Sequence, residues 1–339
     1  MRYEDWGDRC PRWAGVRSVL TSLAGVPVHY LVGDPTGPVD DAPTHVLVPP
    51  MTASAAGWVD LVAAMRELGP VVSADPPGTL TGHTGAPYRQ GSRPKADAAF
   101  VRALLEHLDL RPVVLHSWSM GGLVALSAAE LAPARVSGLV LAAPTLPWRR
   151  TARFEALGWH TIGRAALAVG VPVARLALRV PWARDQATRR RMVEAAEMFA
   201  GERASAVGGD PTSVSREQVT VLAEELQGLD PRKLAGTVTA FASATHAMFV
   251  DQRSTMQLLE RVRVPVLLLW GTDDPLIDQP SHRLHSQRPG WTPHPIEGAG
   301  HLLPVERPDK YVAAVRAWVR DRLRDSQDHL ERVAVTGVT

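Results

Sequence analysis

The chain has one cysteine, Cys10, among its 339 residues. A single cysteine excludes an internal disulfide and is typical of proteins from a reducing compartment. The opening segment, residues 1–6, contains no apolar stretch resembling a signal peptide. We therefore expect a cytoplasmic location.

Cofactor motifs are also missing. The sequence has no His-Glu-x-x-His, no paired Cys-x-x-Cys and no Walker loop, and the Gly-x-Gly at 298–300 is too short to hold a pyrophosphate. We expect neither a metal nor an organic cofactor. The net charge is only +2, which gives no broad electrostatic reason to expect nucleic-acid binding.

Long hydrophobic runs are scarce. The most apolar part of the middle region, Ala165–Ala174, contains Pro172 and is too short to cross a membrane. We interpret it either as a helical core packed on the rest of the protein or as a lipid-facing surface. The arginine runs 149–150 and 189–191 are solvated helix faces or contacts for an anionic carrier or a substrate carboxylate. We expect a small-molecule substrate, free or carrier-bound, and make no prediction of oligomeric state.

Strand and helix patterns alternate along much of the chain, which predicts an α/β fold with a mostly parallel sheet and helices on both faces. The expected strands are 16–23, 26–32, 44–48, 71–74, 113–116, 136–141, 264–270 and 291–296. The expected helices outside the middle region are 55–68, 96–108, 120–131 and 309–324. Between 147 and 261 the strand pattern stops and helical character takes over, and residues 326–339 are predicted to form a disordered tail.

A candidate nucleophile follows the strand at 113–116. The run His116-Ser117-Trp118-Ser119-Met120-Gly121 places Ser119 on a strand-to-helix turn, where a strained backbone exposes a serine oxygen for attack. The elbow motif Gly-x-Ser-x-Gly is imperfect here, because Ser117 stands in place of the first glycine. The alternative interpretation is that Ser119 caps the following helix.

Partners for this serine occur later in the order Ser, Asp, His that the motif requires. Asp273 and Asp274 follow the strand at 264–270, and His301 follows the turn at 297–300. Each has an ordinary alternative: either aspartate could initiate a turn before Pro275, and His301 is one of twelve histidines.

With these pieces the chain resembles the α/β-hydrolase superfamily, specifically its cap-bearing small-molecule hydrolases. The matching segments are Asp-Pro-Pro-Gly at 75–78, the elbow at 117–121, Trp-Gly-Thr-Asp-Asp-Pro at 270–275 and Gly-Ala-Gly-His at 298–301, which continues into Glu-Arg-Pro at 306–308. The resemblance implies an eight-stranded core at 1–146 and 262–325 and a helical cap at 147–261. It implies Ser119 as nucleophile, His301 as base and Asp274 as orienting acid, with Asp273 as the fallback.

The predicted oxyanion hole departs from the family pattern. The family usually has His-Gly after its third strand, whereas here Pro49 and Pro50 follow Val48, and proline has no N–H to donate. The register predicts the N–H groups of Met51 and Met120 as donors. The hydroxyl of Thr52 is a further candidate, placed in the substrate pocket.

The remaining pocket residues are chosen for their apolar surface and their position near the nucleophile or in the cap. Trp118 is expected to form a wall beside Ser119. The cap candidates are Trp148, Trp159 and Met248, followed by Phe154, Trp182 and Phe249. His160 and His246 also fall in the cap as possible substrate contacts, and the alternative is that each is structural.

These residues predict a serine hydrolase that cleaves a small lipophilic ester, thioester or lactone through an acyl-enzyme. Two alternatives stay open: a non-hydrolytic biosynthetic enzyme of the same fold, such as a cyclase or lyase, and a ligand-binding protein with a vestigial triad. The Ala-, Arg- and Val-rich composition is associated with GC-rich bacterial genomes and suggests a role in secondary metabolism.

Overall fold

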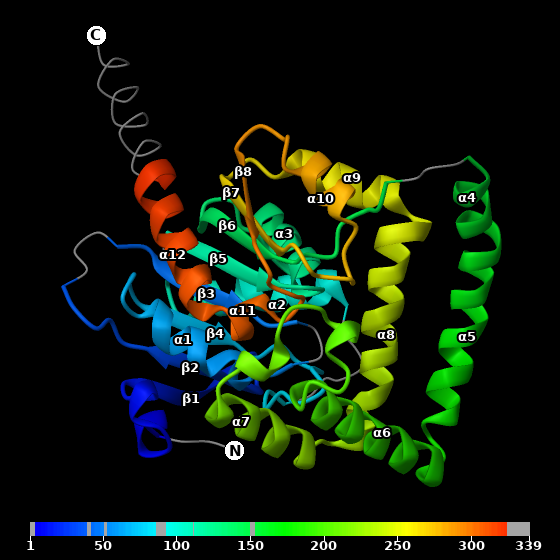
Figure 1. Cartoon of the computed structure of the whole chain (residues 1–339), viewed down its shortest axis with the longest axis horizontal. Helices are drawn as coiled ribbons and strands as arrows, with labels where there is room; N and C mark the ends of the chain where they lie inside the picture. The colour runs from blue at the N-terminus through cyan, green and yellow to red at the C-terminus, as the bar shows by residue number, and fades with distance from the viewer. Residues whose placement is uncertain are drawn as a thin grey trace.

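Eight strands form a single sheet at the centre of the molecule in the computed structural model, which describes residues 4–38, 42–50, 53–85, 93–110, 112–149 and 153–323 (Figure 1). The strand order is β1-β2-β4-β3-β5-β6-β7-β8. β2 pairs antiparallel with β1 and β4, and all other neighbours are parallel. The predicted mostly parallel, eight-stranded sheet is confirmed. The strands are β1 (Val16–Leu23), β2 (Val26–Gly33), β3 (Thr44–Val48), β4 (Val71–Ala74), β5 (Val113–Trp118), β6 (Val136–Ala142), β7 (Val266–Gly271) and β8 (Trp291–Ile296).

Helices cover both faces of this sheet, as expected for parallel strands that are apolar on both sides. Two successive residues of β3 point to opposite faces of the sheet. Leu47 belongs to the cluster that includes Trp58 and Tyr311, whereas Val46 belongs to the cluster that includes Leu104. The first face is covered by α1 (Val59–Met65) and α12 (Pro308–Trp318), and the second by α2 (Pro94–His107), α3 (Gly121–Leu131) and α9 (Gln252–Arg261).

Between β6 and β7 the described residues form only helices and turns, and we call this segment the insertion. Figure 1 shows α4 and α5 as one rod on the outer side, with α8 between it and the sheet. The insertion contains α4 (Arg153–Gly158), a π-helical turn (Trp159–Gly163), α5 (Arg164–Ala177), α6 (Pro181–Phe199), α7 (Arg216–Gln227), α8 (Leu234–Thr245), a π-helical turn (His246–Val250) and α9.

The remaining helices are short. α10 (Gln279–His285) precedes β8. α11 (Leu303–Glu306) lies between the turn that follows β8 and α12, and α12 continues as a π-helical turn (Val319–Leu323). The 3₁₀ turns are Trp6–Asp8, Pro11–Trp13, Ala55–Trp58, Ala204–Ala206, Pro211–Ser213 and Pro231–Lys233. The helix predicted at 55–68 is therefore a 3₁₀ turn followed by a shorter α1. The tail predicted at 326–339 lies outside the described residues.

Candidate active site

Ser119 lies on the turn between β5 and α3, with φ at +53°. Non-glycine residues rarely adopt this region, and the cost of about 1–3 kcal/mol is sustained only where the surroundings fix the backbone. Here the N–H of Ser119 donates to the carbonyl of Ala142 (2.9 Å), and its carbonyl accepts from the N–H groups of Gly122 (3.0 Å) and Thr145 (3.1 Å). Three segments therefore hold the serine at the carboxyl end of β5.

The two small residues that flank the serine differ in how they fit. A Cβ on Gly121 would lie 2.8 Å from the carbonyl oxygen of Pro49, so the loop after β3 requires glycine there. Ser117, at the other position, is fully buried, and its Oγ has no hydrogen-bond partner within the described chain. The fold thus accommodates this serine, at the cost of an unpaired hydroxyl of about 1–3 kcal/mol.

His301 joins Ser119 to a carboxylate. Its Nε2 is 2.9 Å from Ser119 Oγ, and its Nδ1 is 2.8 Å from Oδ2 of Asp274. Asp274 is buried, and its Oδ1 accepts from the N–H of Leu276 (2.8 Å). The fallback candidate, Asp273, is exposed and accepts instead from the Thr272 hydroxyl (3.1 Å). The structure therefore brings together Ser119, His301 and Asp274.

The backbone of the loop that carries His301, residues 297–301, which we call the histidine loop, is fixed from two directions. The indole N–H of Trp118 donates to the carbonyl of His301 (2.8 Å), and the N–H of His301 donates to the carbonyl of Val207 in the insertion (2.7 Å). Because both backbone groups are bonded, the imidazole is held by its main chain as well as by Asp274.

Glu306 connects the same loop to the insertion. Its buried carboxylate accepts the N–H of Gly300 (3.0 Å) and the N–H of Asp210 (2.8 Å). Two glycines make this close approach feasible: a Cβ on Gly208 would lie 1.8 Å from the carbonyl oxygen of Asp273, and one on Gly209 would lie 2.3 Å from the nitrogen of Gly300. From the sequence, Glu306 had no role beyond its place in a segment similar to the family. The consecutive glycines Gly208 and Gly209 were the one sequence signal of this contact.

Beside Ser119 and His301 is a cavity of about 630 Å³. Its lining is mostly apolar and comes from the core loops and from helices α6, α7 and α8 of the insertion. Charged side chains in the lining include Arg191, Glu194 and Glu225. This size and composition are typical of a site for a small organic molecule.

Three of the predicted pocket residues, Trp118, Trp148 and Met248, line this cavity. Trp159 does not, because its ring is stacked on Phe249 with centroids 4.7 Å apart. Phe249 also contacts Trp148 edge to face, with centroids 5.0 Å apart, so Trp159 packs within an aromatic cluster.

Four further candidates in the insertion point elsewhere. Phe154 and Trp182 are 87% and 74% exposed and lie outside the cavity lining. His160 and His246 are also exposed and do not line it. The position of these residues in a helical segment was predicted correctly, but residue type alone does not reveal which side of a helix faces the cavity.

Of the predicted oxyanion donors, the structure describes one. Met120 follows the nucleophile directly at the start of α3, and no described group accepts a hydrogen bond from its N–H. Such an N–H at a helix start is suited to an anionic oxygen. Met51 and Thr52 lie outside the described residues. Their neighbour Pro50 lines the cavity, and its carbonyl accepts from the N–H of Ala53 (2.9 Å).

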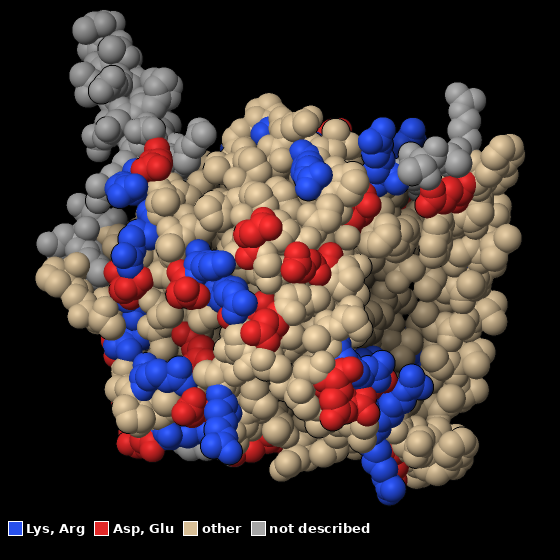
Figure 2. Space-filling model, viewed as in Figure 1, with Lys and Arg blue, Asp and Glu red and all other residues tan. Residues whose placement is uncertain are grey.

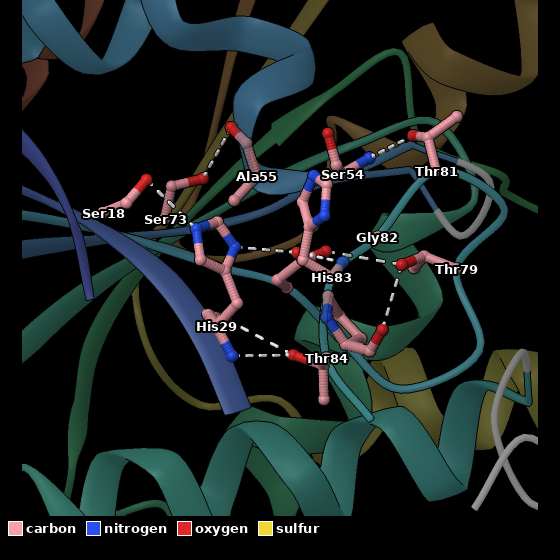
Figure 3. Close-up of polar contacts among 12 residues, drawn as sticks. Ser18, His29, Ser54, Ala55, Ser73, Thr79, Thr81, Gly82, His83 and Thr84 are labelled. Atoms are coloured by element: carbon pink, nitrogen blue, oxygen red, sulfur yellow. Dashed lines mark hydrogen bonds and ion pairs between the residues drawn. The ribbon is translucent and has the colours of Figure 1, made fainter. Parts of the chain in front are cut away.

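A second group of serine, histidine and aspartate lies in the core (Figure 3). His29 Nε2 is 3.2 Å from the hydroxyl oxygen of Ser18, and His29 Nδ1 is 2.9 Å from Oδ2 of Asp75. His29 and Asp75 are fully buried, none of the three lines the cavity, and Ser18 Oγ already accepts from the indole of Trp6 (3.0 Å). This group has no access for a substrate and is structural.

The second group nevertheless fixes a wall of the cavity. Asp75 Oδ2 also accepts the N–H of His83 (2.7 Å), and the Thr81 hydroxyl accepts the N–H of Ser54 (3.0 Å), a bond that Figure 3 shows. His83 Nε2 lies 2.8 Å from a carboxylate oxygen of Glu225 on α7. The loop that carries Thr81 is thereby bonded both to the core and to the insertion.

Comparison with known proteins identifies the family to which the chain belongs. Residues 70–308 match the family described as alpha/beta hydrolase fold. The chain is 24% identical over 213 residues to the uncharacterized hydrolase YugF of Bacillus subtilis, covering 62% of this chain and 67% of YugF.

Solved structures show the same fold. Cfl2 of Burkholderia cenocepacia superposes with a TM-score of 0.67 at 21% identity, covering 94% of this chain and 99% of Cfl2. The epoxide hydrolase CorEH superposes with a TM-score of 0.66 at 17% identity, covering 90% of this chain and 99% of CorEH. At these identities the likeness concerns the fold alone.

Proposed function

Because the chain belongs to the alpha/beta hydrolase fold family, we propose that it is a serine hydrolase that cleaves a small lipophilic ester, thioester or lactone. One observation carries the proposal. The hydrogen-bonded chain from Ser119 through His301 to Asp274 opens on a mostly apolar cavity of about 630 Å³.

In the first half-reaction, Ser119 Oγ attacks the substrate carbonyl carbon while His301 Nε2 accepts its proton. The N–H groups of Met120 and Met51 donate to the oxyanion. The intermediate then expels an alcohol or thiol, which takes its proton from His301 and leaves an ester on Ser119. Loss of one oxyanion donor costs about 2.7–4 kcal/mol of transition-state stabilisation.

In the second half-reaction, His301 removes a proton from water, which attacks the acyl carbon. The bond to Ser119 Oγ then breaks, Oγ takes the proton from His301, and the acid is released. Asp274 accepts the Nδ1–H of the imidazole throughout, which selects the tautomer with a free Nε2 lone pair and stabilises the imidazolium. The 2.8 Å separation from Asp274 Oδ2 and the 2.9 Å separation from Ser119 Oγ support these two roles.

The nucleophile and the cavity together favour this chemistry over others on the same fold. An epoxide hydrolase shares the architecture, but fold does not determine reaction. A serine at position 119 favours acyl transfer, whereas an aspartate there would suggest epoxide or haloalkane hydrolysis. The insertion, residues 147–261, acts in this proposal as the cap whose helices close the lipophilic binding site.

The test combines labelling with turnover. We expect a fluorophosphonate to label Ser119 and short p-nitrophenyl esters to release acid, and Ser119→Ala to lower turnover by about 10⁶. Ser117→Ala is the matched control because it removes a nearby serine hydroxyl that makes no described contact with His301. Wild-type turnover in Ser119→Ala refutes the assignment, and robust labelling without ester turnover favours the non-hydrolytic or ligand-binding alternatives.

A further inference from the structure

The outer side of the α4–α5 rod is apolar and exposed. Ile162, Val169, Val173 and Leu176 are spaced seven, four and three residues apart, which places them along one side of a helix. Their exposed fractions range from 59% to 76%, and α5 contains no buried residue. We call these four residues the outer stripe.

Large aromatic side chains stand at both ends of the outer stripe. Phe154 precedes it on α4 and Trp182 follows it at the start of α6, and both are mostly exposed. Large exposed apolar side chains grouped in this way mark a surface that contacts a partner or a membrane. A helix of this kind, apolar on one side and polar on the flank, is typical of segments that lie in a membrane interface.

The charged residues along the outer stripe are basic. Residues 156–184 contain no aspartate or glutamate but four arginines, at positions 164, 175, 179 and 184, and the acidic residues Glu155 and Asp185 lie immediately outside this range. Figure 2 shows the surface over α5 as largely uncharged, in contrast to the mixed charges over the core. Anionic headgroups attract such a segment, and arginine stems can lie along the apolar surface while the guanidinium groups reach the headgroups.

Three of these arginines line an open depression of about 750 Å³ at the end of α5, together with Arg232. Arg232 is paired with Asp230 (2.8 Å). Arg175, Arg179 and Arg184 form no ion pair with any carboxylate in the described chain, and Arg184 Nε is buried without a hydrogen-bond partner. The depression therefore holds unneutralised donors of the type that bind phosphate.

We propose that this protein docks on an anionic lipid surface through the outer stripe, with lipid phosphates in the arginine-lined depression. The rod lies along the membrane and does not cross it. No single helix in the described part is both long and apolar enough to span a bilayer, and the pair 154–177 and 181–199, which meets the length and composition criteria together, is bent by 102°.

A second copy of the chain is the less favoured occupant. A twofold interface would place the same surface of each copy against the other. That surface offers the arginines few carboxylates, because residues 156–184 of the partner copy contain no aspartate or glutamate. An anionic lipid surface buries the same apolar side chains and neutralises these arginines.

The test is sedimentation of the full chain with vesicles of phosphatidylcholine alone or with about 30 mol % phosphatidylglycerol. We expect binding to the anionic vesicles only, weakened by salt. Arg175→Ala and Arg179→Ala should each lower the partition coefficient about fivefold, and Val169→Glu with Val173→Glu should abolish binding. The control is Leu284→Glu. Leu284 is 52% exposed on α10, outside the insertion, and this variant should bind like the wild type.

Ser119→Ala should bind vesicles like the wild type, so failure of the proposed chemistry and failure of membrane docking are distinguishable. Absence of binding to anionic vesicles overturns the proposal, as does an equal loss in the Leu284→Glu control. A dimer in sedimentation velocity that the Val169→Glu and Val173→Glu pair dissociates would also overturn it, in favour of a second copy.

Discussion

We expect three buried histidines to make the protein sensitive to mild acid. His45 on β3 and His116 on β5 are hydrogen bonded to each other (2.9 Å) beneath α12, and His116 also contacts the Tyr311 hydroxyl (3.0 Å). Burial lowers the pKa of His45 from 6.5 to about 4, and burial together with the neighbouring His45 holds the pKa of His116 well below its usual value. Burial likewise lowers the pKa of His282 on α10 to about 4.

The sign of the effect follows from which state binds protons more readily. Between pH 6.5 and 4 the unfolded chain protonates these histidines and the folded chain does not, so the free energy of unfolding falls as the pH falls. Each histidine contributes about 1.4 kcal/mol for each pH unit, or about 3 kcal/mol over the range for His45 and again for His282. Domains are stable by about 5–15 kcal/mol in total, so we expect unfolding near the lower end of this range.

The assay is urea denaturation at pH 7.5 and pH 5, with His282→Asn as the variant. Asparagine retains an amide N–H for the carbonyl of Asp278, which lies 3.2 Å from His282 Nδ1, but it does not titrate. The variant should lose about 2 kcal/mol less than the wild type between the two pH values. The control, His107→Asn, changes an exposed histidine of α2 and should follow the wild type. An unchanged loss in His282→Asn would refute the reasoning.

Two further substitutions address the site. Asp274→Asn should lower turnover about 10⁴-fold, because the amide favours the wrong imidazole tautomer, and the same loss in Asp273→Asn instead would reassign the acid. Gly209→Ala should lower kcat/KM about 10²-fold by displacing the loop that precedes His301. Gly290→Ala has a comparable φ of +78° but no atom within 4 Å of the added Cβ, so an equal loss there would show that backbone strain alone is responsible.

The sequence allowed the sheet and the three site residues to be predicted because their signals are local. The central strands are short apolar runs, and β5 and β7 are buried at every position. Ser119, Asp274 and His301 follow the ends of β5, β7 and β8, and parallel strands bring their carboxyl ends to one edge. The order of the parallel strands therefore brings the residues of three separate short motifs together in one site.

The insertion was predictable only as helical. Its apolar residues divide between two environments: Trp148 and Met248 face the cavity, whereas Phe154 and Trp182 face solvent. Both environments select the same residue types, and the choice depends on how the rod stands relative to α8, which no local pattern encodes. For this reason the sequence could not decide whether Ala165–Ala174 is a packed core or a lipid-facing surface. The exposure of α5 is the observation that favours a lipid-facing surface.

The contact between the insertion and the histidine loop would link substrate binding to catalysis in the proposed reaction. The insertion provides walls of the cavity, and through Val207 it also accepts the N–H of His301, the proposed general base. Glu306 is bonded to both partners through Gly300 and Asp210, so its carboxylate would be left half-satisfied if the insertion moved away. Since a buried charge that loses a hydrogen bond is costly, the helices over the cavity and the geometry at Ser119 are expected to change together. Removing the insertion would therefore disorder the histidine loop and would not leave an open but competent triad.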